Sequence, residues 1–182
     1  MEIYPTRYRR SIYNHKPAIA ICFIGIGSNI DAVNNMITCA RALRDDFPYI
    51  TFSSVYRTAA RDELQQDDFL NAVVKIETDE SPEEVHFALK SIEEDLKKDP
   101  PYEKGPRTID LDILIYKNPD NQQLTTENLI IPHPRMHDRR FVLEPLCELI
   151  DPNSIDSCSK KTWNSLLLEN TDQKCEKVEM RL

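Results

Sequence analysis

Continuous apolar runs alternate along the chain with segments whose apolar residues recur at helical spacing. The run IAICFIGI at 19–26 is rich in β-branched and aromatic residues, which is typical of a strand buried on both faces. The segment at 31–47 has helical spacing and is stopped by Pro48; its apolar positions are Val33, Met36, Ile37, Ala40 and Leu43. The pattern predicts a strand, a turn and a helix.

Further along, the same order recurs with one additional strand. ITFSSVYR at 50–57 and FLNAVVKIET at 69–78 are strand-like, and we expect the polar segment between them to be a loop. IDLDILIY at 109–116 predicts a fourth strand.

A second helix is expected after Ser81, because Pro82 occupies the first helical position and Glu84 follows three residues after the cap. One apolar face follows, formed by Val85, Leu89, Ile92 and Leu96. Pro100 cannot continue the helix.

The predicted order βαββαβ favours an α+β fold with a ferredoxin-like core, in which helices pack on one face of a mainly antiparallel sheet. The last third of the chain is expected to form a C-terminal extension with a polar loop, a helix and a short further element at 117–128, 141–150 and 161–170. We expect a flexible N-terminal extension, one domain and a C-terminal tail at 1–18, 19–170 and 171–182.

Composition limits the classes of protein. A length of 182 residues suits one domain, and 40% hydrophobic with 30% charged residues is a globular composition. No apolar run approaches the roughly 20 residues that span a bilayer, so a soluble protein without a membrane partner is expected. The net charge of −8 argues against nucleic-acid binding, and any anion site must be built locally.

Cysteine usage and the N-terminal segment bear on localisation. Five cysteines without a CxxC pair are typical of reduced thiols in a cytoplasmic protein. The segment 1–16 is basic and aromatic but lacks the apolar stretch of a secretory signal, so a frayed extension is expected, with organelle targeting as the alternative.

Two aspartates, Asp110 and Asp112, interrupt the fourth apolar run. Strict alternation would place them on one face with Leu114, and Ile109, Leu111, Ile113 and Ile115 on the other. Either this face is solvated or paired with cations, or both carboxylates hold Mg²⁺, with two ions about 3.5–4 Å apart to clamp a phosphoryl group. The pair alone does not decide between these interpretations.

The flanking residues favour an anion site. Arg107 precedes Asp110 by three residues, and a cluster of cationic residues follows the strand: His133, Arg135, His137, Arg139 and Arg140. Pro134 disfavours a helix through His133 and His137, so their spacing does not indicate a zinc-binding pair.

The glycine pair Gly25 and Gly27 is a weak nucleotide signature, because no third glycine and no P-loop lysine follow it. We expect the two glycines to let the chain turn sharply out of the first strand. Ser28 or Asn29 would then lie near the start of the following helix.

Six motifs occur in order: FIGIGSNID, SSVYRT, FLNAVV, IE, GPRTIDLDILIY and IPHPRMHDRRFVLEPL, within 23–146. Together they closely resemble the hydroxymethyl-dihydropterin pyrophosphokinase family of folate biosynthesis, over about residues 19–150. The resemblance implies ATP-dependent transfer of pyrophosphate to the hydroxymethyl group of 6-hydroxymethyl-7,8-dihydropterin, with release of AMP and two Mg²⁺ ions. It also leaves room for association with neighbouring folate-pathway enzymes.

The resemblance also implies roles for individual residues. Asp110 and Asp112 match metal ligands, and Arg107 and Arg139 match catalytic arginines that contact phosphate. The remaining ATP positions are Glu93, Ile113 and His133, and the pterin positions are Thr58, Phe69, Asn71 and Phe141. From the pattern alone, Phe69 and Phe141 are equally typical of core residues. Asn71 would need a buried partner if it faced inward.

The sequence departs from the family at three places. Two prolines and a later glycine are replaced by Ala59-Ala60-Arg61-Asp62, the usual tryptophan by Lys104, and Gly-Arg-x-Arg by Lys97-Lys98-Asp99-Pro100. We therefore expect the lid and pterin loops to differ from those of the family. Alternative functions are another two-metal phosphotransferase, or a non-catalytic paralogue that binds a pterin or nucleotide.

Overall fold

The computed structural model describes residues 19–59, 67–96, 107–118, 124–126 and 129–182. The N-terminal extension and the departures at positions 60–62, 97–100 and 104 lie outside the described residues.

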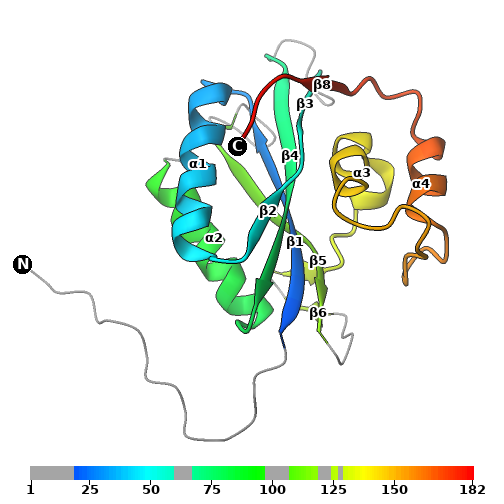
Figure 1. Ribbon diagram of the computed structural model, residues 1–182, viewed down its shortest axis with the longest axis horizontal. Coiled ribbons are helices and arrows are strands. Elements are labelled where there is room, and N and C mark those ends of the chain that lie inside the picture. The colour runs from blue at the N-terminus through cyan, green and yellow to red at the C-terminus, as the bar shows by residue number, and fades with distance from the viewer. Residues whose placement is uncertain (1–18, 60–66, 97–106, 119–123, 127–128) are drawn as a thin grey trace, which may run out of the picture.

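The main sheet is antiparallel, with strand order β5-β1-β4-β3-β8 and β2 paired to β4 (Figure 1). Its strands are β1 (Ala20–Ser28), β2 (Ile50–Phe52), β3 (Val55–Thr58), β4 (Phe69–Thr78), β5 (Asp110–Lys117) and β8 (Glu176–Val178). A hairpin of β6 (Leu124–Thr125) and β7 (Ile130–Ile131) lies within the segment predicted to be loop and just after it. The expected α+β class with an antiparallel sheet is confirmed.

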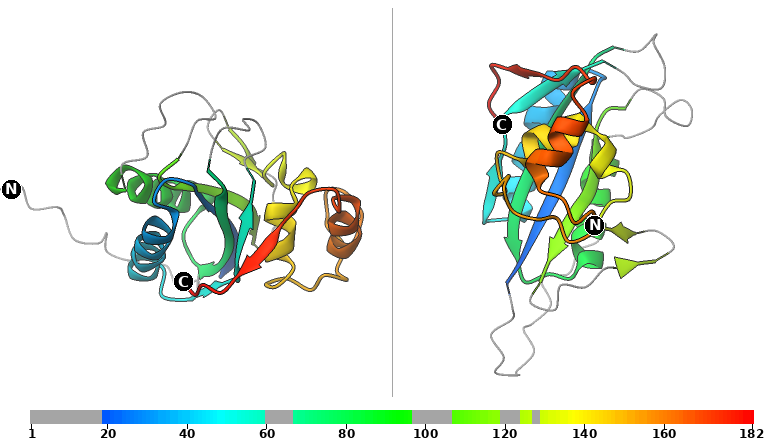
Figure 2. Two further views of the ribbon diagram at one scale, coloured as in Figure 1. Left: turned by 90° about the horizontal axis from the view of Figure 1, so that it is seen from above. Right: turned by 90° about the vertical axis from the view of Figure 1, so that its right-hand side faces the viewer.

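Helices cover both faces of this sheet (Figure 2). One face carries α1 (Ala32–Asp46) and α2 (Pro82–Asp95), and the other carries η1 (Met136–Asp138), α3 (Arg140–Leu146) and α4 (Trp163–Glu169). The expected single helical face therefore holds for α1 and α2, and the C-terminal helices add a second layer. Each layer buries its own cluster; Met36, Leu43 and Leu89 belong to the first, and Phe23, Leu143 and Trp163 to the second.

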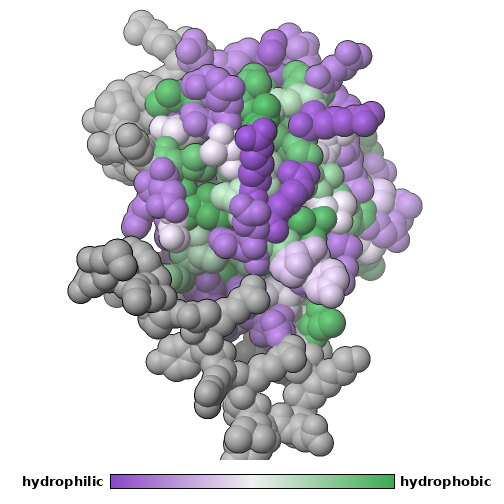
Figure 3. Space-filling model, turned by 60° about the vertical axis from the view of Figure 1, so that its left-hand side comes forward, coloured by the Kyte–Doolittle hydropathy of each residue, from purple (hydrophilic) through white to green (hydrophobic). Residues whose placement is uncertain are grey.

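The outer surface of the α1 and α2 layer mixes hydrophilic and scattered hydrophobic residues (Figure 3). Val33 and Phe87 are among its exposed apolar side chains. Scattered apolar residues are common on protein surfaces. No helix within the described residues is long and apolar enough to cross a membrane.

The start of α2 agrees with the sequence prediction. Ser81 accepts from the Glu84 amide at 3.3 Å, and Glu84 accepts from the Ser81 amide at 2.7 Å, with Pro82 at the first helical position. Two backbone donors are thereby satisfied before the helix begins its own hydrogen bonds.

A bulge in β5 breaks the alternation expected from the sequence. Ile24 pairs with Ile113 and Phe23 with Ile115, so Leu114 is an additional residue between the two pairs. Ile113 lies in the first cluster, whereas Leu114 and Ile115 both lie in the second. The predicted placement of Ile115 beside Ile113 is therefore wrong, because one inserted residue reverses the alternation beyond it.

Three further predictions differ from the structure. Gly25 and Gly27 lie inside β1 and make no turn; the turn comes at Asn29–Asp31, where Asp31 has φ 40°. The strand expected at 50–57 is divided at Ser53, whose hydroxyl accepts from the Val73 amide at 2.9 Å. The expected tail at 171–182 contributes β8, which extends the sheet beside β3.

Candidate functional site

Gly25 and Gly27 of β1 mark the middle of a patch on one face of the sheet, the glycine patch, which Asp110 and Asp112 border on β5 and Asn71 borders on β4. Gly27 stands between Asp110 of β5 and Asn71 of β4, and Gly25 stands opposite Asp112. These residues alternate with members of the first core cluster, so they share the face on which the second cluster lies. A Cβ on Gly27 would come within 3.3 Å of Asn71 Oδ1, which shows how the missing side chain leaves room between the two neighbouring strands.

Carboxylates and basic side chains meet on the β5 side of the glycine patch. Arg107 pairs with Asp110, and His133 Nε2 lies 4.0 Å from Asp112 Oδ2. The side chains of Asp110 and Asp112 are 20% and 45% exposed. Pairing with a cation is therefore present at Asp110, and both carboxylates are partly exposed.

The donor set can be compared with the requirements of a metal ion. The described residues contain no group of three or more His, Cys, Asp or Glu side chains that could enclose a metal. Mg²⁺ typically takes one or two carboxylates and completes its octahedron with water and substrate phosphates. The hard oxygen donors of Asp110 and Asp112, on one open face, fit that requirement.

A buried carboxylate from α2 holds the backbone between the two aspartates. Glu93 is 3% exposed, and its Oε1 accepts from the Leu111 amide at 2.7 Å. Its Oε2 lies 2.7 Å from Lys90 Nζ. Because β5 is the edge strand of the sheet, this amide has no neighbouring strand on its outer side, and Glu93 satisfies it.

The turn after β1 holds the segment that carries Arg107. Asn29 Oδ1 accepts from the Arg107 amide at 2.7 Å, and the Asn29 amide donates to the Arg107 carbonyl at 3.1 Å. Ser28 Oγ donates to the Thr108 carbonyl at 2.5 Å. Ser28 and Asn29 are buried, and sequence reasoning had placed them only near a helix start. Polar residues directly after the apolar run at 19–26 were the signal available in the sequence.

The bulge of β5 anchors the cationic segment. The His133 amide donates to the Leu114 carbonyl at 2.8 Å, which brings His133 next to Asp112. Burial lowers the pKa of His133; Asp112 opposes this shift, and Arg139 and Arg135 reinforce it. The Arg139 guanidinium lies 5.5 Å from the centre of the Phe141 ring, within cation–π distance.

The second histidine of this segment points elsewhere. His137 Nε2 lies 3.1 Å from Asp156 Oδ2, and its ring stacks on Trp163 with centroids 6.0 Å apart. Since His133 faces Asp112, the two histidines diverge, and they do not share an α-helix.

The β4 side of the glycine patch is neutral. Asn71 is 5% exposed and its Nδ2 donates to Thr58 Oγ1 at 2.9 Å, so part of its hydrogen-bonding capacity is met within the protein. Phe69 pairs with Thr58 across β4 and β3 and is half-buried, as is Phe141. Ile113 is not brought to this face, because its side chain packs in the first core cluster.

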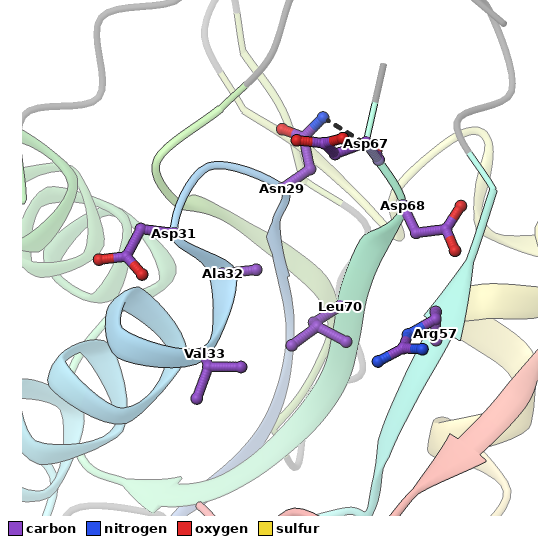
Figure 4. Close-up of a pocket in the computed structure, with 8 residues that line it drawn as sticks. All are labelled: Asn29, Asp31, Ala32, Val33, Arg57, Asp67, Asp68 and Leu70. Carbon is purple, nitrogen blue, oxygen red and sulfur yellow. Dashed lines mark hydrogen bonds between the residues drawn. The ribbon is translucent and has the colours of Figure 1, made fainter. Parts of the chain in front are cut away.

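A separate hollow of about 550 Å³ opens beside the start of α1 (Figure 4). It is lined by Asn29, Asp31, Ala32, Val33, Arg57, Asp67, Asp68 and Leu70, and it contains none of the predicted site residues. Asn29 links it to the site, because its Nδ2 donates to the Asp67 carbonyl at 3.3 Å while its Oδ1 binds Arg107.

Comparison with known proteins gives one consistent family. A model of the 7,8-dihydro-6-hydroxymethylpterin-pyrophosphokinase (HPPK) family matches residues 23–151. The 2-amino-4-hydroxy-6-hydroxymethyldihydropteridine pyrophosphokinase of Aquifex aeolicus is 32% identical over 154 residues, covering 84% of this chain and 94% of the relative. The protein of the same name from Bacillus subtilis is 37% identical over 145 residues, covering 78% and 85%.

Longer proteins also contain the matched region. The mitochondrial folate synthesis bifunctional protein of Arabidopsis thaliana is 36% identical over 147 residues, covering 80% of this chain but 26% of the relative. The solved Plasmodium falciparum HPPK-DHPS with pteroate has a TM-score of 0.65 at 15% identity, covering 88% of this chain and 44% of that chain. This chain thus spans less than half of that solved protein, and the likeness is one of fold.

Fold and site together define an α+β protein with paired carboxylates and clustered cations over one end of an antiparallel sheet. The family model matches most of the chain, and the two relatives named first are 32% and 37% identical to it. The chain belongs to the 7,8-dihydro-6-hydroxymethylpterin-pyrophosphokinase family.

Proposed function

We propose that the chain transfers pyrophosphate from ATP to the hydroxymethyl group of 6-hydroxymethyl-7,8-dihydropterin and releases AMP, in tetrahydrofolate biosynthesis. The observation that carries this proposal is the arrangement of polar side chains on the two sides of the glycine patch. It has charged groups suited to phosphate along β5 and a neutral amide and hydroxyl suited to a heterocycle along β4 and β3. Family membership supports the same activity.

On the charged side, Asp110 and Asp112 would hold Mg²⁺, which neutralises phosphate oxygens and orients them for displacement. Arg107 and Arg139 would contact the phosphates, because a guanidinium fork matches phosphate geometry. His133 lies beside Asp112 and would take part in ATP binding, while Glu93 would act there by fixing the Leu111 backbone. The side chain of Ile113 is turned into the core, so its part in ATP binding is limited to its backbone.

On the neutral side, Asn71 and Thr58 would bind the polar edge of the pterin. Phe69 and Phe141 would supply aromatic faces for its flat ring. With both substrates on the glycine patch, the hydroxymethyl oxygen bonds to the β-phosphorus and its proton passes to water. The bond from this phosphorus to the oxygen bridging the α-phosphate breaks, and AMP leaves. Catalysis then rests on positioning and charge neutralisation.

Two further proposals concern the surroundings of the site. We infer that the chain has a ferredoxin-like core followed by a C-terminal extension. The core has four strand positions: β1, the pair β2 and β3 taken as one, β4, and β5. The strand order and the order of helices support this inference. Relatives that carry the matched region inside longer folate synthesis proteins support association with neighbouring folate-pathway enzymes.

Product analysis tests the activity. The protein is incubated with ATP, Mg²⁺ and the reduced pterin, and phosphorus NMR follows the products. AMP and a diphosphorylated pterin are expected, with loss of turnover on chelation and recovery on adding Mg²⁺. ADP or free pyrophosphate in place of AMP would identify a different phosphotransferase. Binding of a non-hydrolysable ATP analogue without turnover of ATP would identify a binding paralogue.

A further inference from the structure

Arg139 occupies a joint between two helical segments. It follows η1 and precedes α3, with extended backbone angles of φ −124° and ψ 104°. Its carbonyl accepts from the Val142 and Leu143 amides, both at 3.0 Å. Because one extended residue connects η1 to α3, the direction of the Arg139 side chain depends on the angle between these segments.

A single side chain from beyond α4 bridges this joint. Gln173 Nε2 donates to the Asp138 carbonyl at 3.0 Å, and Gln173 Oε1 accepts from the Arg140 amide at 3.0 Å. One planar amide thus binds the residues immediately before and after Arg139. It also satisfies an amide at the start of α3, where the cap residue makes no side-chain hydrogen bond.

Asn170 fixes the orientation of that amide. Its Oδ1 accepts from Gln173 Nε2 at 2.7 Å, and its Nδ2 donates to the His137 carbonyl at 3.0 Å. Asn170 itself is buried at the end of α4. Two amide side chains therefore hold the backbone at three residues around Arg139: His137, Asp138 and Arg140. Both lie after residue 151, where the family match ends.

We propose that Gln173, oriented by Asn170, is a positioning residue that sets the direction of the Arg139 guanidinium toward the phosphates. This proposal rests on the proposed function, which gives Arg139 its phosphate contact. Loss of the bridge lets the angle between η1 and α3 vary, and a misplacement of about 1 Å can lower a rate by up to about a hundredfold.

The test compares Gln173→Ala and Asn170→Ala with the matched controls Lys174→Ala and Asn164→Ala, which change exposed neighbours. Gln173→Ala should lower kcat about tenfold while KM for the pterin changes less than about threefold, and the controls should stay within about twofold. In an Arg139→Ala background, Gln173→Ala should cause no further loss, because its effect passes through Arg139.

A second measurement does not depend on turnover. Amide hydrogen exchange at Arg140, followed by NMR, should accelerate at least about tenfold in Gln173→Ala and remain unchanged in Lys174→Ala. Unchanged exchange, or an equal kcat loss with and without Arg139, would overturn the positioning role. A wild-type protein that makes no AMP would instead reject the proposed function, and the exchange result would still decide whether Gln173 fixes the joint.

Discussion

The reactive side chains of the site depend on residues that hold their backbone. Glu93 binds the amide between Asp110 and Asp112, and Asn29 binds the amide of Arg107. Buried hydrogen-bonding groups of this kind are costly to leave unsatisfied. The precision of the carboxylates and the arginine therefore arises partly from polar side chains on α2 and on the turn after β1.

Removal of the Glu93 carboxylate should destabilise the fold. Glu93→Ala leaves the buried Leu111 amide without its acceptor, at a cost of about 1–3 kcal/mol in the free energy of unfolding. Glu93→Gln retains an oxygen acceptor and should lose clearly less. Urea unfolding measures both variants, with the exposed Glu94→Ala as control. A loss in Glu93→Ala no larger than in the control would refute the anchoring role.

Gly27→Ala should weaken pterin binding while leaving the free energy of unfolding nearly unchanged. The added Cβ meets Asn71 Oδ1 at 3.3 Å and fills space on the glycine patch between Asn71 and Asp110. Alanine is favoured over glycine in strands by roughly 0.5–1 kcal/mol, which offsets the tight contact, so unfolding should change by less than about 1 kcal/mol. The Kd for the pterin, measured by calorimetry with an ATP analogue present, should rise about tenfold. An unchanged Kd would mean that the pterin does not lie over Gly27.

At the scale of elements, patterns confined to one segment were predictable. The helices α1 and α2 and the strand β4 follow from periodicity and capping residues, and β4 has the predicted bounds. The bulge of β5 and the strand β8 were not predictable, because both depend on pairing with distant strands. The same reason applies to the site. The motifs indicated Asp110 and Arg107, whereas the contact of Arg107 with Asn29 joins residues 78 positions apart.

The capping box of α2 gives a test at this scale. Ser81→Ala removes the acceptor for the Glu84 amide and should cost about 1 kcal/mol in the free energy of unfolding. The exposed Ser91→Ala in the same helix is the control. Equal unfolding midpoints for the two variants in urea would contradict a stabilising cap.

The same cap should depend on pH. The backbone hydrogen bond from Ser81 lowers the pKa of Glu84 below its ordinary value of 4.5. A carboxylate with a lowered folded-state pKa contributes stability above its unfolded pKa, and this contribution is lost as pH falls through the folded pKa. The gap between wild type and Glu84→Gln, measured by urea unfolding, should therefore be widest near neutral pH and narrow below pH 4.5. A gap that widens on acidification would contradict this sign.

At the scale of the whole molecule, one face of the sheet packs against α1 and α2, and the other face carries the candidate site. The α1 and α2 layer buries the first core cluster, and the C-terminal layer shares the opposite face with the glycine patch. The chain carries a net charge of −8, yet Arg107 pairs with Asp110, and Arg139 lies close enough to His133, beside Asp112, to affect its pKa. Guanidiniums beside paired carboxylates give an acidic protein the local positive groups that a phosphate ligand with its Mg²⁺ needs.

The most direct test of this account is pterin-dependent AMP release by wild type and by Asp112→Asn, in ATP and Mg²⁺, with the exposed Asp45→Asn as control. Wild type and control should release AMP only when the reduced pterin is present. Asp112→Asn should lower the rate by at least about a hundredfold with an unchanged circular dichroism spectrum, because a metal ligand is lost. Near-normal AMP formation by folded Asp112→Asn would contradict the assignment of this carboxylate as a metal ligand, and with it the proposed function of the site.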